Sequence, residues 1–516
     1  MRRSILILMF LFTALPAGAK DFYIAAKQAG TGSGTGCSTA KPYTWFNTSS
    51  SWGTGASQIG PGTTVHLCGT FTGTAGQTLL SAGGSGTSSS PITIKFEPNA
   101  VLAAPYWSSL GTINLSGRSY FVIDGGTNGL IKNTANGTGR GNAQDSRAIY
   151  ARSCTGCVVK NLTIADLYVR TSVTDVAVRQ TAVNCVYWLN SNNITITHVT
   201  CHDAGWAFAG NGNNFTLSYS NIYNIDHGLA FGPQGTNSGF SIHDNHIHDY
   251  VKWDSTTNAY HHDGLHIWGQ NGGIATNGVI YNNLFDGDSG QNVTAHIFLQ
   301  DSIKHVAVYN NVFLVPYTRT INSLWFCGIS HAGVLPGGPA TGNSAYNNFI
   351  RTGGHRQGAA IYALAQSDFT AINNVLLGGN TDLSVQGGGY LSSAGINNNI
   401  YQDLLADANT LNGLNYQGRN FHDLASWQAA CHCDSKSKLL TATKINTSSL
   451  GQLLSGSPAI SGAANLSNIT TGSLALLAKD IVGAVRPVSG NWDVGAYKFG
   501  STALPSAPAG VTATVQ

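Results

Sequence analysis

The stretches GVIYNNLFDG (278–287), VAVYNNVFLV (306–315) and FTAINNVLLG (369–378) share one pattern, a short alternating apolar run, an Asn-Asn pair and a second apolar run. Related phrases stand at Ser220-Asn221-Ile222, Asp244-Asn245-His246-Ile247, Asn347-Asn348-Phe349 and Asn398-Asn399-Ile400. The Asn positions 221, 245, 283, 311, 348, 374 and 399 are 24, 38, 28, 37, 26 and 25 residues apart. The repeating unit is therefore about 25 residues long and is extended where a loop is inserted.

Each unit holds two or three short strands of period two, separated by Asn, Gly and Asp turns, with no helical stretch between them. A unit this small cannot bury its own apolar face, so it must stack on its neighbours. Stacking predicts an all-β parallel solenoid whose turn Asn residues bond along the stack. A propeller is the alternative, but its blades need about 40 residues and the commonest spacing here is shorter.

Composition agrees with a large β protein. The chain has 516 residues, of which 63 are Gly and only 9% are charged, against roughly 25% in an average soluble domain. Exposed helix faces are normally filled with charged side chains, so this shortage argues against a helical fold. The formal net charge of +3 is too small to gather polyanions, and we expect no nucleic-acid partner.

The N-terminus resembles an export signal. Arg2 and Arg3 precede an apolar run from Ile5 to Leu15, and Ala17-Gly18-Ala19 provides small residues for cleavage. We predict a signal peptide over 1–19 and a monomeric protein secreted to the periplasm or the extracellular space, without a membrane anchor. The solenoid is expected over 20–500. Residues 501–516 resemble a linker followed by the truncated start of a fibronectin-III-like module, and a frayed tail is the alternative.

Nine cysteines in an oxidising compartment favour disulfides. Sequence proximity suggests the pairs Cys37–Cys68, Cys154–Cys157, Cys185–Cys201 and Cys431–Cys433, which leaves Cys327 unpaired. Cys154/Cys157 and Cys431/Cys433 could instead be metal ligands, but neither has a second half at zinc-site spacing.

Both ends of the chain carry a family resemblance. Asp21-Phe22-Tyr23-Ile24-Ala25, followed by a Gly/Ser-rich stretch and Cys37, resembles the entry strand of secreted right-handed parallel β-helix proteins of the pectate-lyase-like superfamily. Asp480-Ile481-Val482-Gly483, Arg486-Pro487 and Asp493-Val494-Gly495-Ala496-Tyr497 are similar to their last coil. The resemblance implies a right-handed parallel β-helix over 21–500. It does not fix the activity, because this superfamily contains lyases, hydrolases, epimerases and non-enzymatic adhesins.

Histidines concentrate in one segment of this charge-poor chain. Of 16 His, nine lie between 198 and 266, together with six Asp: His198, His202, His227, His243, His246, His248, His261, His262, His266, Asp203, Asp226, Asp244, Asp249, Asp254 and Asp263. Such clusters of titratable groups are typical of acid/base sites.

Alignment of coils suggests which residues face outward. Gly205–Phe208, Gly228–Phe231, Gly264–Trp268 and Ala295–Leu299 look like one strand on successive coils. Because side chains alternate along a strand, one set of these residues should face inward and the other outward. The expected inward residues are Trp206, Phe208, Leu229, Phe231, Leu265, Ile267, Ile297 and Leu299. The expected outward residues are Ala207, Ala230, His266 and His296. Trp268, Phe298 and Tyr362 would form a neighbouring outward row. Aromatic rings in such a row stack on sugars, or merely on each other.

Three carboxylates precede this strand, at Asp203, Asp226 and Asp263. Coils lie about 4.8 Å apart, so acids one or two coils apart would be separated by roughly 5 or 10 Å, which brackets the spacings of glycosidases. We predict these three as catalytic, assisted by His262 and His266. The alternative is that Asp-x-Gly is simply turn chemistry. His262-Asp263-x-x-His266 matches no established metal spacing, and no metal site is predicted.

An insertion over 249–262 lengthens one coil and is expected to wall a substrate groove. The predicted substrate-binding residues are Lys252, Trp253, Tyr260, Trp268, His296, Phe298 and Arg319.

Three functions follow from these residues. We favour a glycoside hydrolase acting on a polysaccharide through the three Asp and without a cofactor, although the Asn-Thr-Asp, Asp-Asp and Arg-Ile-Lys motifs of the pectin-hydrolysing branch are missing. The first alternative is a lyase that eliminates from a uronate polymer, with Lys252, Lys304, Arg319 and Tyr260 available and Ca²⁺ bound by Asp side chains. The second alternative is a non-catalytic glycan-binding adhesin.

Overall fold

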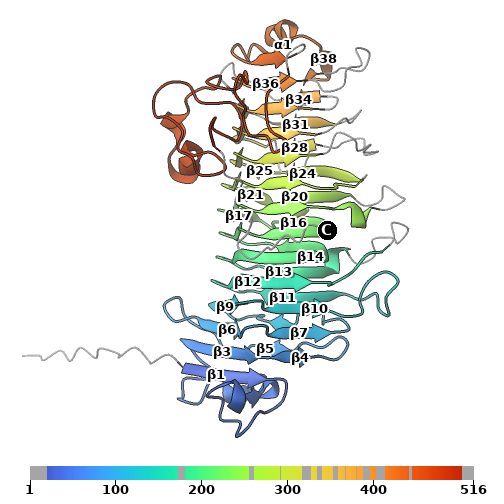
Figure 1. Cartoon of the computed structure of the whole chain (residues 1–516), viewed down its shortest axis with the longest axis vertical. Helices are drawn as coiled ribbons and strands as arrows, with labels where there is room; N and C mark the ends of the chain where they lie inside the picture. The colour runs from blue at the N-terminus through green and yellow to red at the C-terminus, as the bar shows by residue number, and fades with distance from the viewer. Residues whose placement is uncertain are drawn as a thin grey trace, which may run out of the picture.

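In the computed structural model the chain is a tall stack of parallel coils (Figure 1). The structure describes residues 20–171, 180–254, 261–290, 292–315, 327–333, 340–352, 358–366, 368–378, 381–386, 395–402, 413–440 and 444–501. The predicted signal peptide, most of the C-terminal tail, Tyr260 and Arg319 lie outside these residues. No helix in the described part is long and apolar enough to cross a membrane.

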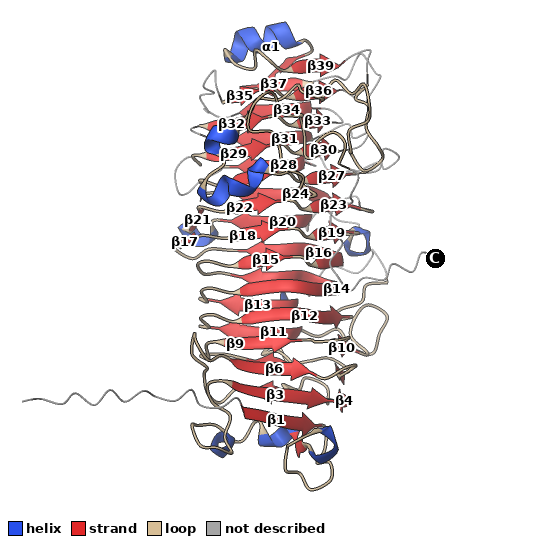
Figure 2. Ribbon diagram, turned by 60° about the vertical axis from the view of Figure 1, so that its left-hand side comes forward, coloured by secondary structure: helices blue, strands red, loops and turns tan. Residues whose placement is uncertain are grey.

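Most coils contribute strands to three parallel stacks, which we call sheets 1, 2 and 3 and which long strands such as β14 (Thr195–Gly210) and β16 (Asn221–Phe231) join into one hydrogen-bonded sheet (Figure 2). Sheet 1 contains β1 (Lys20–Ala25), β3 (Thr63–Cys68), β6 (Ile92–Phe96), β9 (Phe121–Asp124), the starts of β12 (Val158–Ala165) and β14 (Thr195–Gly210), β15 (Thr216–Ser218), β18 (Ser241–His243), β22 (Val279–Tyr281), β26 (Ala307–Tyr309), β29 (Asn343–Tyr346), β32 (Phe369–Ile372) and β35 (Ile396–Asn397).

Sheet 2 follows sheet 1 in every coil. It contains β4 (Thr70–Thr72), β7 (Val101–Ala104), β10 (Leu130–Asn133), the end of β12, the middle of β14, the start of β16 (Asn221–Phe231), β19 (His246–His248), β23 (Leu284–Asp286), β27 (Val312–Leu314), β30 (Phe349–Arg351), β33 (Val375–Leu377), β36 (Ile400–Gln402) and β39 (Lys438–Leu440).

Sheet 3 completes the coil. It contains β5 (Leu80–Ser81), β8 (Ile113–Asn114), β11 (Ser146–Arg152), β13 (Val183–Leu189), the ends of β14 and β16, β20 (His262–Trp268), β24 (Val293–Gln300), β28 (Cys327–Ala332), β31 (Ala359–Leu364), β34 (Thr381–Gln386) and β37 (Leu414–Tyr416). Because strands pair in parallel with the next coil, the predicted parallel β-helix is confirmed and a propeller is excluded.

The repeated Asn residues form a ladder between sheets 1 and 2. The backbone N–H of Asn283 donates to Oδ1 of Asn311 at 3.0 Å, and its side-chain amide donates to the same oxygen at 2.9 Å. The same contacts join Asn245, Asn283, Asn311, Asn348, Asn374 and Asn399 in order. These buried turn groups are thereby satisfied, and the predicted bonding along the stack is confirmed.

Alternating aliphatic residues fill the interior. In sheet 1, Ile242, Ile280 and Val308 are equivalent on successive coils and are fully buried. The four predicted disulfides are formed, at Cys37–Cys68, Cys154–Cys157, Cys185–Cys201 and Cys431–Cys433, and Cys327 is free and buried. The paired cysteines are therefore not metal ligands.

Elements outside the three sheets are few. A small parallel sheet joins β17 (Thr236–Ser238), β21 (Ile274–Thr276) and β25 (Ile303–Lys304), β2 (Lys41–Pro42) pairs with β1, and β38 (Arg419–Phe421) is antiparallel to β37. The helix α1 (Leu424–Cys431) lies at the C-terminal end of the stack, and 3-10 turns occupy Cys37–Thr39, Tyr43–Trp45, Ser49–Ser51, Gln180–Ala182, Val251–Trp253, Gln270–Gly272, Ser467–Ile469 and Gly472–Ala478.

The C-terminal segment 444–501 differs from its sequence-based prediction. It adds no further coil and packs back along the outside of sheets 1 and 2, orange to red in Figure 1. Trp492 and Tyr497 are buried there against outward residues such as Tyr309 and Val375. Arg486 is also buried and donates to the carbonyl of Gly495, which fixes the segment. Among the described residues, the apolar cluster that holds this segment includes none of sheet 3.

Candidate functional site

The outer face of sheet 3 brings histidines of two coils together. Strand pairing places Trp206, His227, Asp263 and Ala295 at equivalent positions of four coils. His266 follows Asp263 by only three residues, yet both side chains reach the same place. The reason is that the two residues between them, Gly264 and Leu265, both face the interior, so the alternation of sides is interrupted. Only glycine fits at 264, because a Cβ there would collide with Phe285 and the carbonyl of His296.

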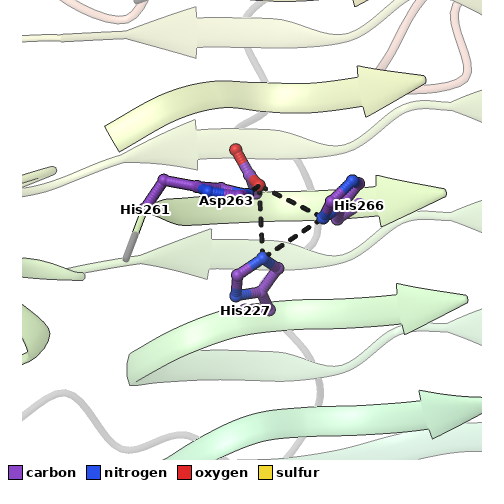
Figure 3. A group of neighbouring side chains, drawn as sticks. All are labelled: His227, His261, Asp263 and His266. Carbon is purple, nitrogen blue, oxygen red and sulfur yellow. Dashed lines mark hydrogen bonds and ion pairs between the residues drawn. The ribbon is translucent and has the colours of Figure 1, made fainter. Parts of the chain in front are cut away.

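Four side chains converge on one point, and we call them the sheet 3 cluster: His227, His261, Asp263 and His266 (Figure 3). Oδ2 of Asp263 lies 3.2 Å from Nε2 of His227, 3.1 Å from Nε2 of His261 and 3.5 Å from Nδ1 of His266. Nδ1 of His266 and Nε2 of His227 are 3.4 Å apart. Asp263 is fully buried, whereas the side chain of His261 is 45% exposed and gives the cluster access to solvent.

A buried chain of polar groups supports His227 from behind. Its Nδ1 contacts Oδ2 of Asp226 at 2.6 Å. Oδ1 of Asp226 lies 3.1 Å from Nδ1 of His262, whose Nε2 lies 3.0 Å from Oδ1 of Asp254. Asp226 and His262 are completely buried, so they orient His227 and have no exposed surface of their own.

The remaining cluster groups are also fixed. Oδ1 of Asp263 accepts the backbone N–H of Ala295 at 2.9 Å, and Nε2 of His266 donates to Oε1 of Gln300 at 3.0 Å. These bonds hold the carboxylate and the ring so that Oδ2 and Nδ1 face the cluster.

Burial and neighbouring charges shift the pKa values of His227 and His266 in opposite directions. Burial alone would lower the pKa of His227, but the attraction of Asp226 and then Asp263 raises this pKa to about 10. Burial also favours protonation of Asp263, yet His261 and His227 hold the pKa of Asp263 well below its usual range. For His266, burial outweighs the attraction of Asp263, and with the repulsion of His227 and His261 it lowers the pKa to about 3. Closely placed groups with opposite shifts are typical of functional sites.

Aromatic rings surround the cluster on the same face. Phe298 is stacked on His266 with ring centroids 4.7 Å apart, and Trp268 lies 4.8 Å from His266. Trp206 packs edge-on against Trp268 at 5.6 Å. All three aromatic side chains are half-buried, so part of each ring remains accessible. The rings contact each other, as one of our alternatives supposed, and still line the surface beside the cluster.

The predicted register was wrong on the first coil. Trp206 pairs with His227 and faces outward, whereas we predicted it inward, at the position of Leu229. Asp203 pairs with neither Asp226 nor Asp263, because it occupies the left-handed corner (φ 52°) that Asn224 (φ 52°) occupies on the next coil. Aligning the coils by their similar Asp-Gly and Asp-x-Gly sequences therefore matched Asp203 with Asp226 and Asp263, although these positions are not equivalent in the structure.

The three predicted acids consequently do not form one row. Asp203 contacts Nδ1 of His202 at 2.7 Å and Nζ of Lys252 at 3.3 Å, on the side of sheet 2. These groups outweigh its burial and lower the pKa of Asp203. Asp226 is sealed behind His227, and its pKa is likewise held far below the usual range despite burial, chiefly by His227. Only Asp263 belongs to the cluster.

Two predicted substrate contacts lie in the interior. His296 is fully buried beside Phe285, Phe313 and Tyr250, because it follows the inward position of Gly264 rather than that of His266. Trp253 is 1% exposed, packs against Tyr168 and donates from its indole to the carbonyl of Asn224.

Other predicted residues are accessible. Trp268 and Phe298 face outward beside the cluster as expected, with Phe298 in the column of His266 and Tyr362 rather than in that of Trp268. Lys252 is exposed at the corner of sheets 2 and 3, and Lys304 lies in the separate strand β25.

Several site residues were not singled out from the sequence. His227 and His261 belong to the histidine-rich segment, but we assigned them no role, and Gln300 and Trp206 were missed. These residues can be located by aligning the coils at the left-handed corner that Asp203, Asn224 and Asp249 share. That corner sets the register of the sheet 3 strand that comes after it.

Comparisons with known proteins add a likeness to solved structures. No protein-family model and no curated protein matches the sequence. Pectate lyase Pel9A is 15% identical, with a TM-score of 0.45, and the match covers 94% of this chain and 97% of that one. A mutant of the PL6 family alginate lyase AlyGC is 15% identical (TM-score 0.42; 74% and 51% covered). The GH136 lacto-N-biosidase from Eubacterium ramulus is 12% identical (TM-score 0.42; 78% and 67% covered). We base the function on the residues of this chain itself.

Proposed function

We propose that this protein is an exported enzyme that cleaves an acidic polysaccharide by β-elimination on the outer face of sheet 3. The observation that carries the proposal is the convergence of three imidazoles on one carboxylate oxygen beside half-buried aromatic rings. The four disulfides agree with the export that the N-terminal sequence predicts.

The aromatic rings suit a sugar chain. Trp206, Trp268 and Phe298 present ring surface from three coils, those of β14, β20 and β24, next to the cluster. Rings of this kind stack against the apolar faces of pyranoses, while nearby polar groups fix the orientation of the ligand.

Access to the acids favours elimination over hydrolysis. A glycosidase needs two carboxyl groups that flank the scissile bond, one of them able to donate a proton. Asp226 and Asp263 have no exposed surface, and Asp203 is turned toward His202 and Lys252. These three acids therefore offer no accessible pair on one face.

Elimination makes different demands. A base removes the C5 proton of a uronate, and the electrons of that C–H bond form a C4=C5 double bond. The C4–O bond breaks with its electron pair leaving on oxygen, and that oxygen takes up a proton; no water is consumed. The step also requires positive charge near the uronate carboxylate. An imidazole-rich cluster, with His261 half exposed, supplies nitrogen groups suited to these roles.

A panel of neutral and uronate polysaccharides tests the proposal. We expect ultraviolet-absorbing unsaturated ends from one or more uronate polymers, and we expect a His266→Ala variant to form them at least about 100-fold more slowly. Reducing ends without unsaturation would show a hydrolase and overturn the reaction class. Retention of a polymer without any product would show a binding protein and overturn the enzymatic assignment.

A further inference from the structure

We infer that His227, His261, Asp263 and His266 form a binding site for one divalent transition-metal ion of the Zn²⁺ class. The site offers three imidazole nitrogens and one carboxylate oxygen, and these four atoms all lie within 4.8 Å of one another. Imidazole and carboxylate are the ligands that such ions take in proteins, most often four at a time for zinc.

The spacing of the four atoms matches a tetrahedron. Zinc bonds to nitrogen and oxygen are about 2.0–2.2 Å long, so ligand atoms at the corners of a tetrahedral site lie roughly 3.3–3.6 Å apart. Four of the six separations here are 3.1, 3.2, 3.4 and 3.5 Å, and the two between His261 and the other imidazoles are within 4.8 Å. The side chains therefore already lie close to the arrangement that the ion requires.

In His227 and His266, the ring nitrogen that points away from the cluster is hydrogen-bonded, so the lone pair of the other ring nitrogen can point toward the ion. Nδ1 of His227 is engaged by Asp226, and Nε2 of His266 donates to Gln300. A bound ion would displace the proton from Nε2 of His227, as metal ligation of an imidazole requires. With the remaining protons on the outer nitrogens, Nε2 of His227 and Nδ1 of His266 both face the same point. A histidine ligand whose other nitrogen donates to a carboxylate or carbonyl is the usual support of a metal site.

The carboxylate supplies an independent sign. Oδ1 of Asp263 accepts the N–H of Ala295, whereas buried Oδ2 has beside it the three imidazole nitrogens at 3.1–3.5 Å but, among the residues that the structure describes, no well-aligned hydrogen bond. A buried carboxylate oxygen without such a partner is costly. A cation placed between Oδ2 and the three nitrogens removes that cost.

The donor set selects the kind of ion. Ca²⁺ takes six to eight oxygen ligands, as a typical range, and a cluster with three nitrogens and one oxygen does not fit it. This cluster is therefore not the site of the Ca²⁺ considered for a lyase. In the proposed β-elimination, an ion at this position would contribute positive charge next to the substrate carboxylate, and the base would be a group other than the three ligating imidazoles. That role rests on the proposed function, whereas ion binding does not.

Metal content of the whole mature protein tests the inference without any substrate. The protein is stripped with a chelator, dialysed against Zn²⁺ and analysed by elemental mass spectrometry. We expect one tightly held zinc per chain, at least 100-fold weaker binding in Asp263→Asn, and unchanged binding in Asp286→Asn, which alters a separate His/Asp group on sheet 2. Stoichiometric zinc that survives Asp263→Asn, or no retained zinc in the wild type, would overturn the site.

His261→Ala guards against a folding defect. Its side chain is 45% exposed, so its removal leaves the buried hydrogen bonds intact. We expect folded protein with clearly weaker zinc binding, and loss of the visible absorption that tetrahedral Co²⁺ gives in the wild type. Wild-type Co²⁺ spectra typical of six oxygen ligands would contradict the assignment. Zinc binding without any polysaccharide cleavage would overturn the proposed function and leave the metal site standing.

Discussion

Two groups of histidine and aspartate lie on neighbouring faces of the same coils, and they differ in how their side chains are partnered. In the sheet 3 cluster three imidazoles share one oxygen of Asp263. On sheet 2, His246, His248 and Asp286, which we call the sheet 2 cluster, are also close enough to hold an ion. Here the partners are separate, because His246 contacts Asp286 at 2.7 Å and His248 contacts Asp249 at 2.6 Å.

The difference between the two clusters is clearest at Nε2 of His248, the ring nitrogen that does not contact Asp249. It contacts Oδ1 of Asn221 at 3.1 Å, so both ring nitrogens of His248 have protein partners. His248 is also stacked between His246 and Tyr223, at 4.1 and 5.0 Å. An ion at this place would have to displace existing bonds, whereas on sheet 3 it would complete them. Proximity of ligand atoms therefore predicts less than the direction of their lone pairs.

Activity should separate the two clusters most strongly. His266→Ala is expected to reduce kcat/KM on the cleaved polymer by about 10²–10⁴-fold, because it removes an imidazole from the reaction centre. His246→Ala should change kcat/KM less than about threefold, since the sheet 2 cluster lies on another face. Initial rates of formation of unsaturated ends measure both. Equal losses in the two variants would contradict the placement of the reaction on sheet 3.

Thermal stability should respond to zinc through the sheet 3 cluster alone. A ligand at 100 times its Kd stabilises the folded state by about 2.7 kcal/mol. We expect a zinc-dependent rise of Tm in the wild type and in Asp286→Asn, and none in Asp263→Asn. Differential scanning calorimetry with and without chelator measures the shift. A shift that disappears in Asp286→Asn instead would assign the ion to sheet 2.

Support behind the ligands should matter as well. Asp226→Asn keeps the size of the side chain but weakens the contact that orients His227. Loss of such a supporting group costs about 10–100-fold in metal affinity. Competition with a fluorescent zinc chelator measures it, and Asp249→Asn is the matched control, because Asp249 makes the corresponding contact to His248 on sheet 2. Unchanged affinity in Asp226→Asn would show that His227 is not held as a ligand.

Much of the fold could be predicted from the sequence because it repeats. The Asn phrases recur at the same corner of each coil, and Asn245 through Asn399 bond one to the next as their spacing indicates. The C-terminal segment could not be predicted in this way. It crosses coils instead of adding one, and its contacts, such as that of Asn310 with the carbonyl of Lys479, join residues far apart in sequence.

The candidate site was predicted only in outline. The concentration of histidines pointed to the correct segment, and Asp263 and His266 do meet. The register failed because the corners at Asp203 and Asn224 adopt the left-handed conformation, which no alternation pattern reveals. Period two failed a second time at Gly264, where two consecutive residues turn inward. His296 is therefore buried, and Phe298 takes the place beside His266 that we predicted for His296.

Sugar contact should be a smaller effect than loss of the cluster. Trp268→Ala removes a half-buried ring next to His266. An aromatic contact is worth about 0.5–1.5 kcal/mol, so KM should rise roughly two- to tenfold with little change in kcat. Tyr223→Ala, on sheet 2, is the matched control and should leave KM unchanged. A fall in kcat alone would show that Trp268 positions the cluster rather than the substrate.

Acid should weaken the sheet 2 pairs only slightly. Burial favours protonation of Asp249, but His248 and the backbone N–H of Asp288, which donates to Oδ1 at 2.8 Å, together with the nearby His246 lower its pKa below 3.8. The stabilisation is therefore present above pH 3.8 and is lost as pH falls through the folded-state pKa. Because the Asp249 side chain is 39% exposed, Asp249→Asn should cost less than about 1 kcal/mol at neutral pH. Urea denaturation should show this gap closing between about pH 5 and pH 2, whereas a gap that widens in acid would contradict the ionised pairing of His248 with Asp249.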